Sequence, residues 1–340
     1  MTRARAILSL ILLGAAGQAQ ETLPKLVTPE IDKSIRRGLE FLARTQNRDG
    51  SWRGSGGEGV YPVAMTALAG MALVGEGSTP TRGKYWRQVR KAVDFLLAQA
   101  QSNGLITMPA EEGRSMYGHG FATMFLAQVY GMEEDPQRQE RLHDVLSKAV
   151  QLTARAQSGP GGWYYTADSG MDEGSVTVTQ MQALRACRNA GITVPVQTVQ
   201  KAVGYIKKSA NSDGGIRYSA TSGGEGRAPI TAAAVAVMYN AGKYDDPLAE
   251  KSLAYALRTL PVDGRNQGHH YYAHLYLAQA LYQRGGQDWE RYYPKMAAWL
   301  QRQQSSDGSW MGDGVGTTYG TAIALTILQL PYALVPIYQR

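Results

Sequence analysis

Acidic residues stand in front of two apolar segments, where acid–base chemistry is possible. Asp172 and Glu173 directly precede the apolar stretch 176–189, and Asp313 lies ahead of the stretch 318–330 in the same way. Such carboxyl groups can transfer protons or hold a cation. Acidic residues are also favoured at helix N-termini for electrostatic reasons alone. We therefore name these three as candidate catalytic residues, with helix-end stabilisation as the alternative.

Histidines occur near the starts of two other apolar segments. One lies in MYGHGFATM, and three lie in GHHYYAHLYLAQ. The i, i+4 spacing of His270 and His274 places both on one helix face, where a carboxylate from elsewhere would complete a metal site. Hydrogen bonding within a tyrosine-rich rim is the alternative, and we predict no metal and no cofactor. The residues that we predict to line a cavity or binding site are Tyr117, His119, His269, His270, His274 and Tyr319.

The segments that carry these residues belong to an internal repeat. QNRDGSW at 46–52 recurs as QQSSDGSW at 303–310, and weaker copies lie between them. Each copy begins with a basic and a small residue, continues with apolar residues at helical spacing, and ends at a glycine-containing turn. A second apolar segment, nearly free of charge, follows every turn. These second segments are 62–74, 117–130, 176–189, 230–240, 271–283 and 318–330.

A helix pair repeated six times predicts an all-α protein. An open stack of such pairs needs polar capping repeats at its ends. Here the last segment is as apolar as the middle ones, and the first and last copies are the best preserved. We therefore predict an α/α toroid, in which about six helical hairpins form a closed ring with the apolar helices inside and the amphipathic helices outside.

The repeat resembles the QW motif of squalene and hopene cyclases, whose helical ring is shared by protein prenyltransferase β subunits. The resemblance implies the ring and its superfamily, and it implies no particular reaction. A Gln can satisfy open backbone groups at a helix end, and a Trp face can pack on the neighbouring repeat. We assign a structural role to the residues that match the motif best: Gln46, Trp52, Gln157, Trp163, Gln304 and Trp310.

The catalytic groups that this resemblance implies are incomplete. Hopene-type cyclases protonate an alkene with an Asp-x-Asp-Asp-Thr cluster, but alignment of its threonine with Thr177 puts Ser175 and Val176 at two of the three acidic positions. Prenyltransferases hold zinc with an Asp-x-Cys pair and a histidine. The chain has one cysteine, Cys187, and Arg185 stands where that aspartate is required.

These departures favour a binding or scaffold toroid with an apolar central cavity. Its ligand is expected to be a lipid or other apolar small molecule, or a protein. An enzyme that acts on an isoprenoid or another lipid is the alternative. A carbohydrate-active enzyme is a third class, which rests on fold analogy alone.

The N-terminus has the pattern of a secretory signal over residues 1–19, with two arginines, an apolar run at 6–16 and a GQA cleavage site. We expect export to the periplasm or the medium, an N-terminal extension over 20–31 and a single repeat domain over 32–340. No other segment is apolar for long enough to span a bilayer. The net charge of +7 is not clustered with aromatic residues, so we expect no nucleic-acid binding.

Overall fold

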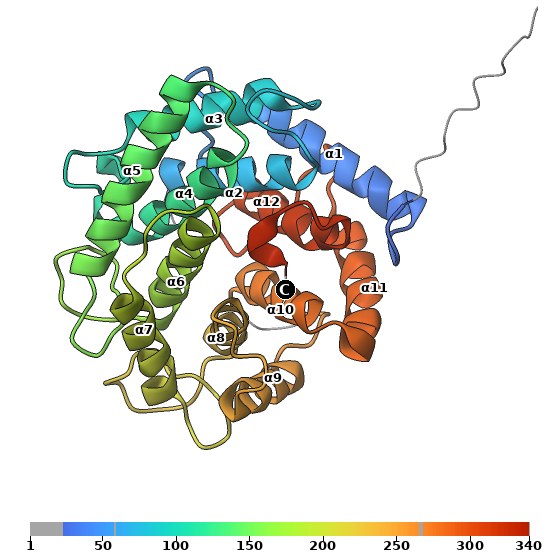
Figure 1. The fold of residues 1–340 in the computed structure, drawn as a ribbon. Helices are drawn as coiled ribbons and strands as arrows, with labels where there is room; N and C mark the ends of the chain where they lie inside the picture. The colour runs from blue at the N-terminus through green and yellow to red at the C-terminus, as the bar shows by residue number, and fades with distance from the viewer. Residues whose placement is uncertain (1–22, 58, 265–267, 340) are drawn as a thin grey trace, which may run out of the picture.

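The computed structural model describes residues 23–57, 59–264 and 268–339, which form twelve α-helices in two concentric layers (Figure 1). The inner layer consists of α2 (Pro62–Gly75), α4 (Ser115–Tyr130), α6 (Gly174–Asn189), α8 (Ala228–Asn240), α10 (His270–Arg284) and α12 (Thr317–Gln329). The outer layer consists of α1 (Pro29–Thr45), α3 (Trp86–Ala98), α5 (Pro136–Arg155), α7 (Val196–Ser209), α9 (Pro247–Thr259) and α11 (Gly286–Gln303).

The inner helices close into a ring, because α12 packs against α2 as well as against α10 (Figure 1). The predicted α/α toroid is therefore confirmed, and the six apolar segments coincide with the six inner helices to within a few residues. The predicted boundary at Asp32 falls inside α1, which begins at Pro29 after its N-cap Thr28. The predicted signal, residues 1–19, lies outside the described residues.

Burial separates the two layers as the residue pattern predicts. Every residue of α2 is buried, whereas in α1 the buried residues follow a single stripe from Ile31 to Leu42 at helical spacing. Among the described residues, no helix combines the length and the apolar character needed to cross a bilayer.

Three glutamines of the repeat each tie their own turn to the next outer helix. The side-chain Nε2 of Gln304 donates to the carbonyl of Gly308 in its own turn (3.0 Å) and to that of Ser34 in α1 (2.9 Å). Gln46 and Gln157 make the same two kinds of bond, to their own turns and to α3 and α7. The structural role predicted for these residues is therefore supported directly by their hydrogen bonds.

The tryptophans and glycines of the repeat fix the spacing of the layers. Trp310 is fully buried, and its indole N–H donates to the carbonyl of Leu300 in α11 (2.7 Å). Gly308 has φ +90°, and a Cβ there would lie 2.5 Å from the carbonyl oxygen of Arg37. The same close approach occurs at Gly50, Gly104, Gly161 and Gly214, each against the carbonyl of a lysine within the next outer helix. Glycine is required there because a side chain would meet backbone atoms.

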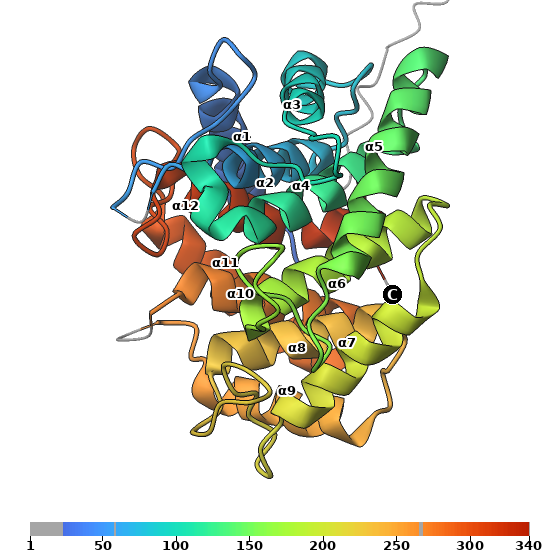
Figure 2. The same cartoon turned by 90° about the vertical axis from the view of Figure 1, so that its left-hand side faces the viewer.

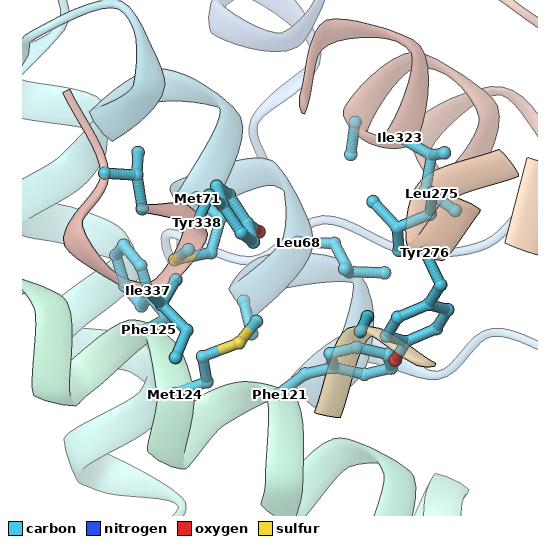
Figure 3. Close-up of a cluster of buried hydrophobic side chains, with 14 of the residues drawn as sticks. Leu68, Met71, Phe121, Met124, Phe125, Leu275, Tyr276, Ile323, Ile337 and Tyr338 are labelled. Carbon is cyan, nitrogen blue, oxygen red and sulfur yellow. The ribbon is translucent and has the colours of Figure 1, made fainter. Parts of the chain in front are cut away.

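The C-terminal segment fills the middle of the ring at one end. The 3-10 helix η3 (Pro336–Tyr338) packs against α6 and α10, and the chain ends over the ring in Figure 1 and at its side in Figure 2. Ile337 and Tyr338 lie among side chains of α2 and α4 (Figure 3). All ten residues labelled there are at most 7% exposed. The apolar interior is therefore packed at this level by the protein's own side chains.

Candidate functional site

Tyrosines gather at the N-terminal ends of the inner helices. Tyr117, Tyr272 and Tyr319 are each the third residue of their helices, α4, α10 and α12. Tyr165 and Tyr218 lie in the loops before α6 and α8. All five residues are half-buried, so each is in contact with both the protein and solvent. We call these five residues the tyrosine mouth.

The tyrosines of the mouth contact one another or raise one another's pKa. The rings of Tyr117 and Tyr165 are 5.8 Å apart, and the hydroxyls of Tyr165 and Tyr218 are hydrogen-bonded at 2.7 Å. Burial raises the pKa of Tyr272 and Tyr319 well above the usual value, and nearby Tyr117 raises both further. These phenols therefore remain protonated at neutral pH and can donate hydrogen bonds to a ligand.

Glu173 connects the mouth to the backbone of α6. It is the N-cap of that helix: its Oε2 accepts hydrogen bonds from the amide of Val176 (2.9 Å) and the hydroxyl of Ser175 (2.6 Å). The hydroxyl of Ser175 is in turn bonded to that of Tyr117 at 2.5 Å. Burial raises the pKa of Glu173, although these hydrogen bonds act in the opposite direction. This carboxylate adjoins the mouth but already has a structural task.

Asp313 and Asp172 also bind backbone amides. The two oxygens of Asp313 accept from the amides of Tyr271 and Tyr272, both at 3.0 Å, so this carboxylate caps α10 from the loop before α12. Asp172 accepts from the amide of Ala220 at 3.1 Å. Burial, and after it the charge of Asp172, raises the pKa of the Tyr205 phenol in α7, which places Asp172 on the outer-layer side. All three carboxylates that we proposed as catalytic therefore stabilise local backbone.

A fourth carboxylate, which the sequence did not single out, also has a raised pKa. Glu111 lies in the 3-10 helix η1 (Pro109–Arg114) and is 2% exposed. Its Oε1 accepts from the amide of Val63 at the start of α2, and its buried Oε2 has no partner. Burial raises the pKa of Glu111 to about 7. Its place in the loop before an inner helix, which it shares with Asp313, is the signal that could have revealed it.

His119 has a structural position between the layers, contrary to the cavity role that we predicted. Its Nδ1 accepts from the amide of Ile106 (3.2 Å), so Nε2 carries the proton and pairs with the hydroxyl of Thr153 (3.0 Å). The ring is fully buried, and burial lowers its pKa to about 4. In four other repeats a threonine hydroxyl accepts the equivalent amide bond: Thr66, Thr177, Thr231 and Thr321.

His270 and His274 lie on the side of α10 that faces α11. The rings of His270 and His274 are 4.3 Å apart, which confirms their shared helix face. His270 is 4.4 Å from the ring of Trp299, and Nδ1 of His274 pairs with the hydroxyl of Tyr292 at 2.9 Å. Burial lowers the pKa of His274 to about 3. His269 is the exposed N-cap of α10 at φ +62°. Among the described residues, no three His, Cys, Asp or Glu side chains form a group able to hold a metal.

Comparison with known proteins supports the superfamily at the level of the fold. No family model matches the sequence. An 81-residue stretch is 35% identical to the lanosterol synthase of Homo sapiens, and it covers 24% of this chain and 11% of that protein. The chain thus spans a small part of the curated relative that it matches.

Solved structures with the same ring include two different kinds of enzyme. The type II terpene cyclase MstE from Scytonema has a TM-score of 0.63 at 14% identity, over 91% of this chain and all of that chain. An α-1,6-mannanase from Salegentibacter sp. HEL1_6 has a TM-score of 0.64 at 9% identity, over 89% of this chain and 99% of that chain. The terpenoid cyclase-like toroid is therefore confirmed as a fold, and a fold of this kind does not determine a reaction.

Proposed function

We propose that the protein is an exported toroid that binds an amphiphilic lipid at the tyrosine mouth and does not cyclise it. The observation that carries this proposal is the state of the candidate carboxylates. Asp172, Glu173 and Asp313 each accept hydrogen bonds from backbone amides. Protonation of an alkene requires a carboxylic acid aimed at the substrate, and these groups serve helix ends and loops instead.

The packing of the ring supports binding at the mouth instead of deep inside. Tyr276 is fully buried beneath Tyr272, with the two rings 4.9 Å apart, and Phe121 is 7% exposed. Farther along the ring axis, Ile337 and Tyr338 occupy the interior (Figure 3). A ligand that entered from the mouth would meet these side chains, because protein interiors leave few voids.

The chemistry around the mouth suits a ligand with a polar head and an apolar tail. The phenols supply hydrogen-bond donors and aromatic faces. Three exposed apolar side chains, Val60, Met171 and Met311, lie in loops that lead to inner helices. Exposed apolar surface is a common feature of binding sites. MstE has been solved with geranylgeranyl dihydroxybenzoate as substrate, at a TM-score of 0.62 and 14% identity, and that compound has such a head and tail.

Native mass spectrometry of the protein purified from its own periplasm or growth medium tests this proposal. We expect a mature chain that begins at Gln20 and a bound lipid that organic solvent releases. The variant Tyr117→Phe should retain less lipid, whereas Tyr130→Phe, at the opposite end of the same helix, should retain as much as the wild type. A ligand-free protein, or equal retention by both variants, would refute binding at the mouth.

A second candidate function rests on Glu111. Its pKa of about 7 keeps much of this carboxyl protonated at neutral pH, and its buried Oε2 has no partner. Both properties are expected of a general acid. The enzyme alternative therefore predicts turnover of an isoprenoid that is lost in Glu111→Gln. The binding proposal predicts no turnover by either protein.

A further inference from the structure

A groove of about 670 Å³ opens on the outside of the toroid, between the outer helices α9 and α11. Its apolar lining includes Leu257, Leu260 and Trp299, and its charged lining includes Lys295 and Arg302. The groove lies away from the tyrosine mouth and shares none of its residues. The groove lies at the repeat position where the other junctions hold a glycine-containing turn, and this position indicates the kind of ligand that the groove can bind.

At five other junctions a glycine-containing turn fills the equivalent space. The turn glycine packs against the carbonyl of a basic residue within the next outer helix. At two of these junctions, arginine side chains of that helix also bind the carbonyls of the turn. Arg37 donates to the carbonyls of Ser305 (2.8 Å) and Ser306 (3.1 Å), and Arg155 donates to that of Asn103 (3.0 Å). Such charge-assisted bonds hold the turn against the next helix.

The fifth repeat does not supply this turn. Leu260 replaces the glutamine that three of the copies have at this position, so the side-chain bonds that this glutamine makes to the next outer helix are absent. Gly264 has φ +61°, and a Cβ there would meet His270 in place of a carbonyl of α11. At Gly264 the chain therefore lies against α10. The space that a turn occupies elsewhere remains as the groove.

The cationic residues that would hold such a turn are still present. Lys295 occupies the repeat position of Arg37, and Arg302 occupies that of Arg155. Both side chains are exposed on α11 and line the groove. Within the part of the chain that the structure describes, no hydrogen bond or ion pair is found for either of them, in contrast to their counterparts.

We propose that this groove binds a glycine-containing turn of a partner protein. Carbonyl oxygens of the partner's turn accept hydrogen bonds from Lys295 and Arg302, and an apolar side chain of that turn packs on Leu260 and Trp299. The partner residue is smaller than tryptophan, because the buried Met296 replaces the small residue found at this position in the other repeats. A second protein is needed because the chain's own glycine turns are already used at the other five junctions.

The chain's own second turn, QSNGLI at 101–106, provides a defined probe, because its apolar residue is isoleucine and Arg155 binds it in the fold. We would cyclise this peptide, label it with fluorescein and measure its binding to the full chain by fluorescence anisotropy. We expect saturable binding that weakens at least about tenfold when Lys295→Ala and Arg302→Ala are combined, since two charge-assisted hydrogen bonds are lost. The matched control is Arg258→Ala, the same repeat position on α9, which should bind as the wild type does.

Three results would overturn this inference. The cyclic peptide does not bind, a scrambled cyclic peptide binds equally well, or the double variant binds as tightly as the wild type. Sedimentation of the wild type and the double variant tests the other occupant, a second copy of this chain. A dimer that the double variant loses would assign the groove to self-association and would also refute a heterologous partner.

Discussion

The side-chain amide of Gln304 donates to the backbone carbonyl of Ser34, 270 residues earlier in the chain, at 2.9 Å. The bond joins the last turn of the protein to its first outer helix. Gln46 and Gln157 join consecutive repeats inside the chain in the same way. The ring is therefore closed by the same contact that joins two other pairs of neighbouring repeats, so this closing bond should be important for stability.

Replacement of Gln304 by alanine should lower the free energy of unfolding by about 1–3 kcal/mol, because the carbonyls of Ser34 and Gly308 lose a buried partner. Urea denaturation of the purified variant measures this change. The neighbouring Gln303 is exposed, and its replacement by alanine should change the stability by less than about 0.5 kcal/mol. Equal effects of the two substitutions would show that the closing contact is unimportant.

The neutral state of His119 should make stability fall in acid. Burial lowers its pKa to about 4, whereas an unfolded histidine titrates near about 6.5. The unfolded chain therefore binds a proton first as the pH falls. The stability contribution of His119 is complete above about pH 6.5 and decreases toward pH 4, by about 3 kcal/mol in all.

The variant His119→Thr tests this expectation, because threonine occupies the same position in four other repeats. As the pH falls from about 7 to 4.5, the unfolding free energy of the wild type should decrease relative to that of the variant. His274 titrates in the same direction in both proteins and cancels in this difference. A difference that does not change with pH would mean that His119 is not held neutral by burial.

Glu111 should produce the opposite pH dependence. Burial raises its pKa to about 7, so the folded state binds a proton that the unfolded state releases above about pH 4.3. The stability contribution of Glu111 is complete below that value and is lost as the pH rises through 7. Relative to Glu111→Gln, the wild type should lose about 3 kcal/mol between about pH 4.3 and pH 8. Parallel stability curves for the two proteins would contradict the raised pKa.

The C-terminal segment should contribute strongly to the core of the ring. Ile337 is 1% exposed between inner helices, and its replacement by alanine should cost about 2–5 kcal/mol through lost burial and a cavity. Leu334, three residues earlier, is 45% exposed, and its replacement should have little effect. Thermal and urea unfolding of both variants provide the measurement. A similar small effect at both positions would show that the segment does not fill the ring.

Much of the fold could be predicted because it depends on short-range signals. Uncharged apolar segments identified the inner helices, and the recurring glutamine and tryptophan identified the contacts between repeats. His119 was placed wrongly because its equivalence to the threonines requires the loop length of each repeat, which differs from copy to copy. The raised pKa of Glu111 depends on burial between α2 and α4, which no local pattern encodes.

Two other features depend on departures from the repeat. The C-terminal segment with Ile337 and Tyr338, which fills the ring at one end, lies beyond the last copy of the repeat. The periodicity of the sequence therefore does not predict its position. The groove between α9 and α11 follows from Leu260 at a glutamine position and from the position of Gly264 against α10. The sequence shows that this copy is degraded, but only the packed structure shows that the degradation leaves a space lined by Lys295 and Arg302.

The central claim is that the tyrosine mouth binds an amphiphilic lipid without converting it. The most direct test incubates the mature protein with geranylgeranyl dihydroxybenzoate, measures binding by calorimetry, and recovers the compound for chromatography and NMR, since cyclisation leaves the mass unchanged. We predict saturable binding, about three- to tenfold weaker in Tyr117→Phe through loss of one hydrogen bond, and recovery of the unchanged acyclic compound. A cyclic isomer that forms with the wild type and not with Glu111→Gln would contradict the account.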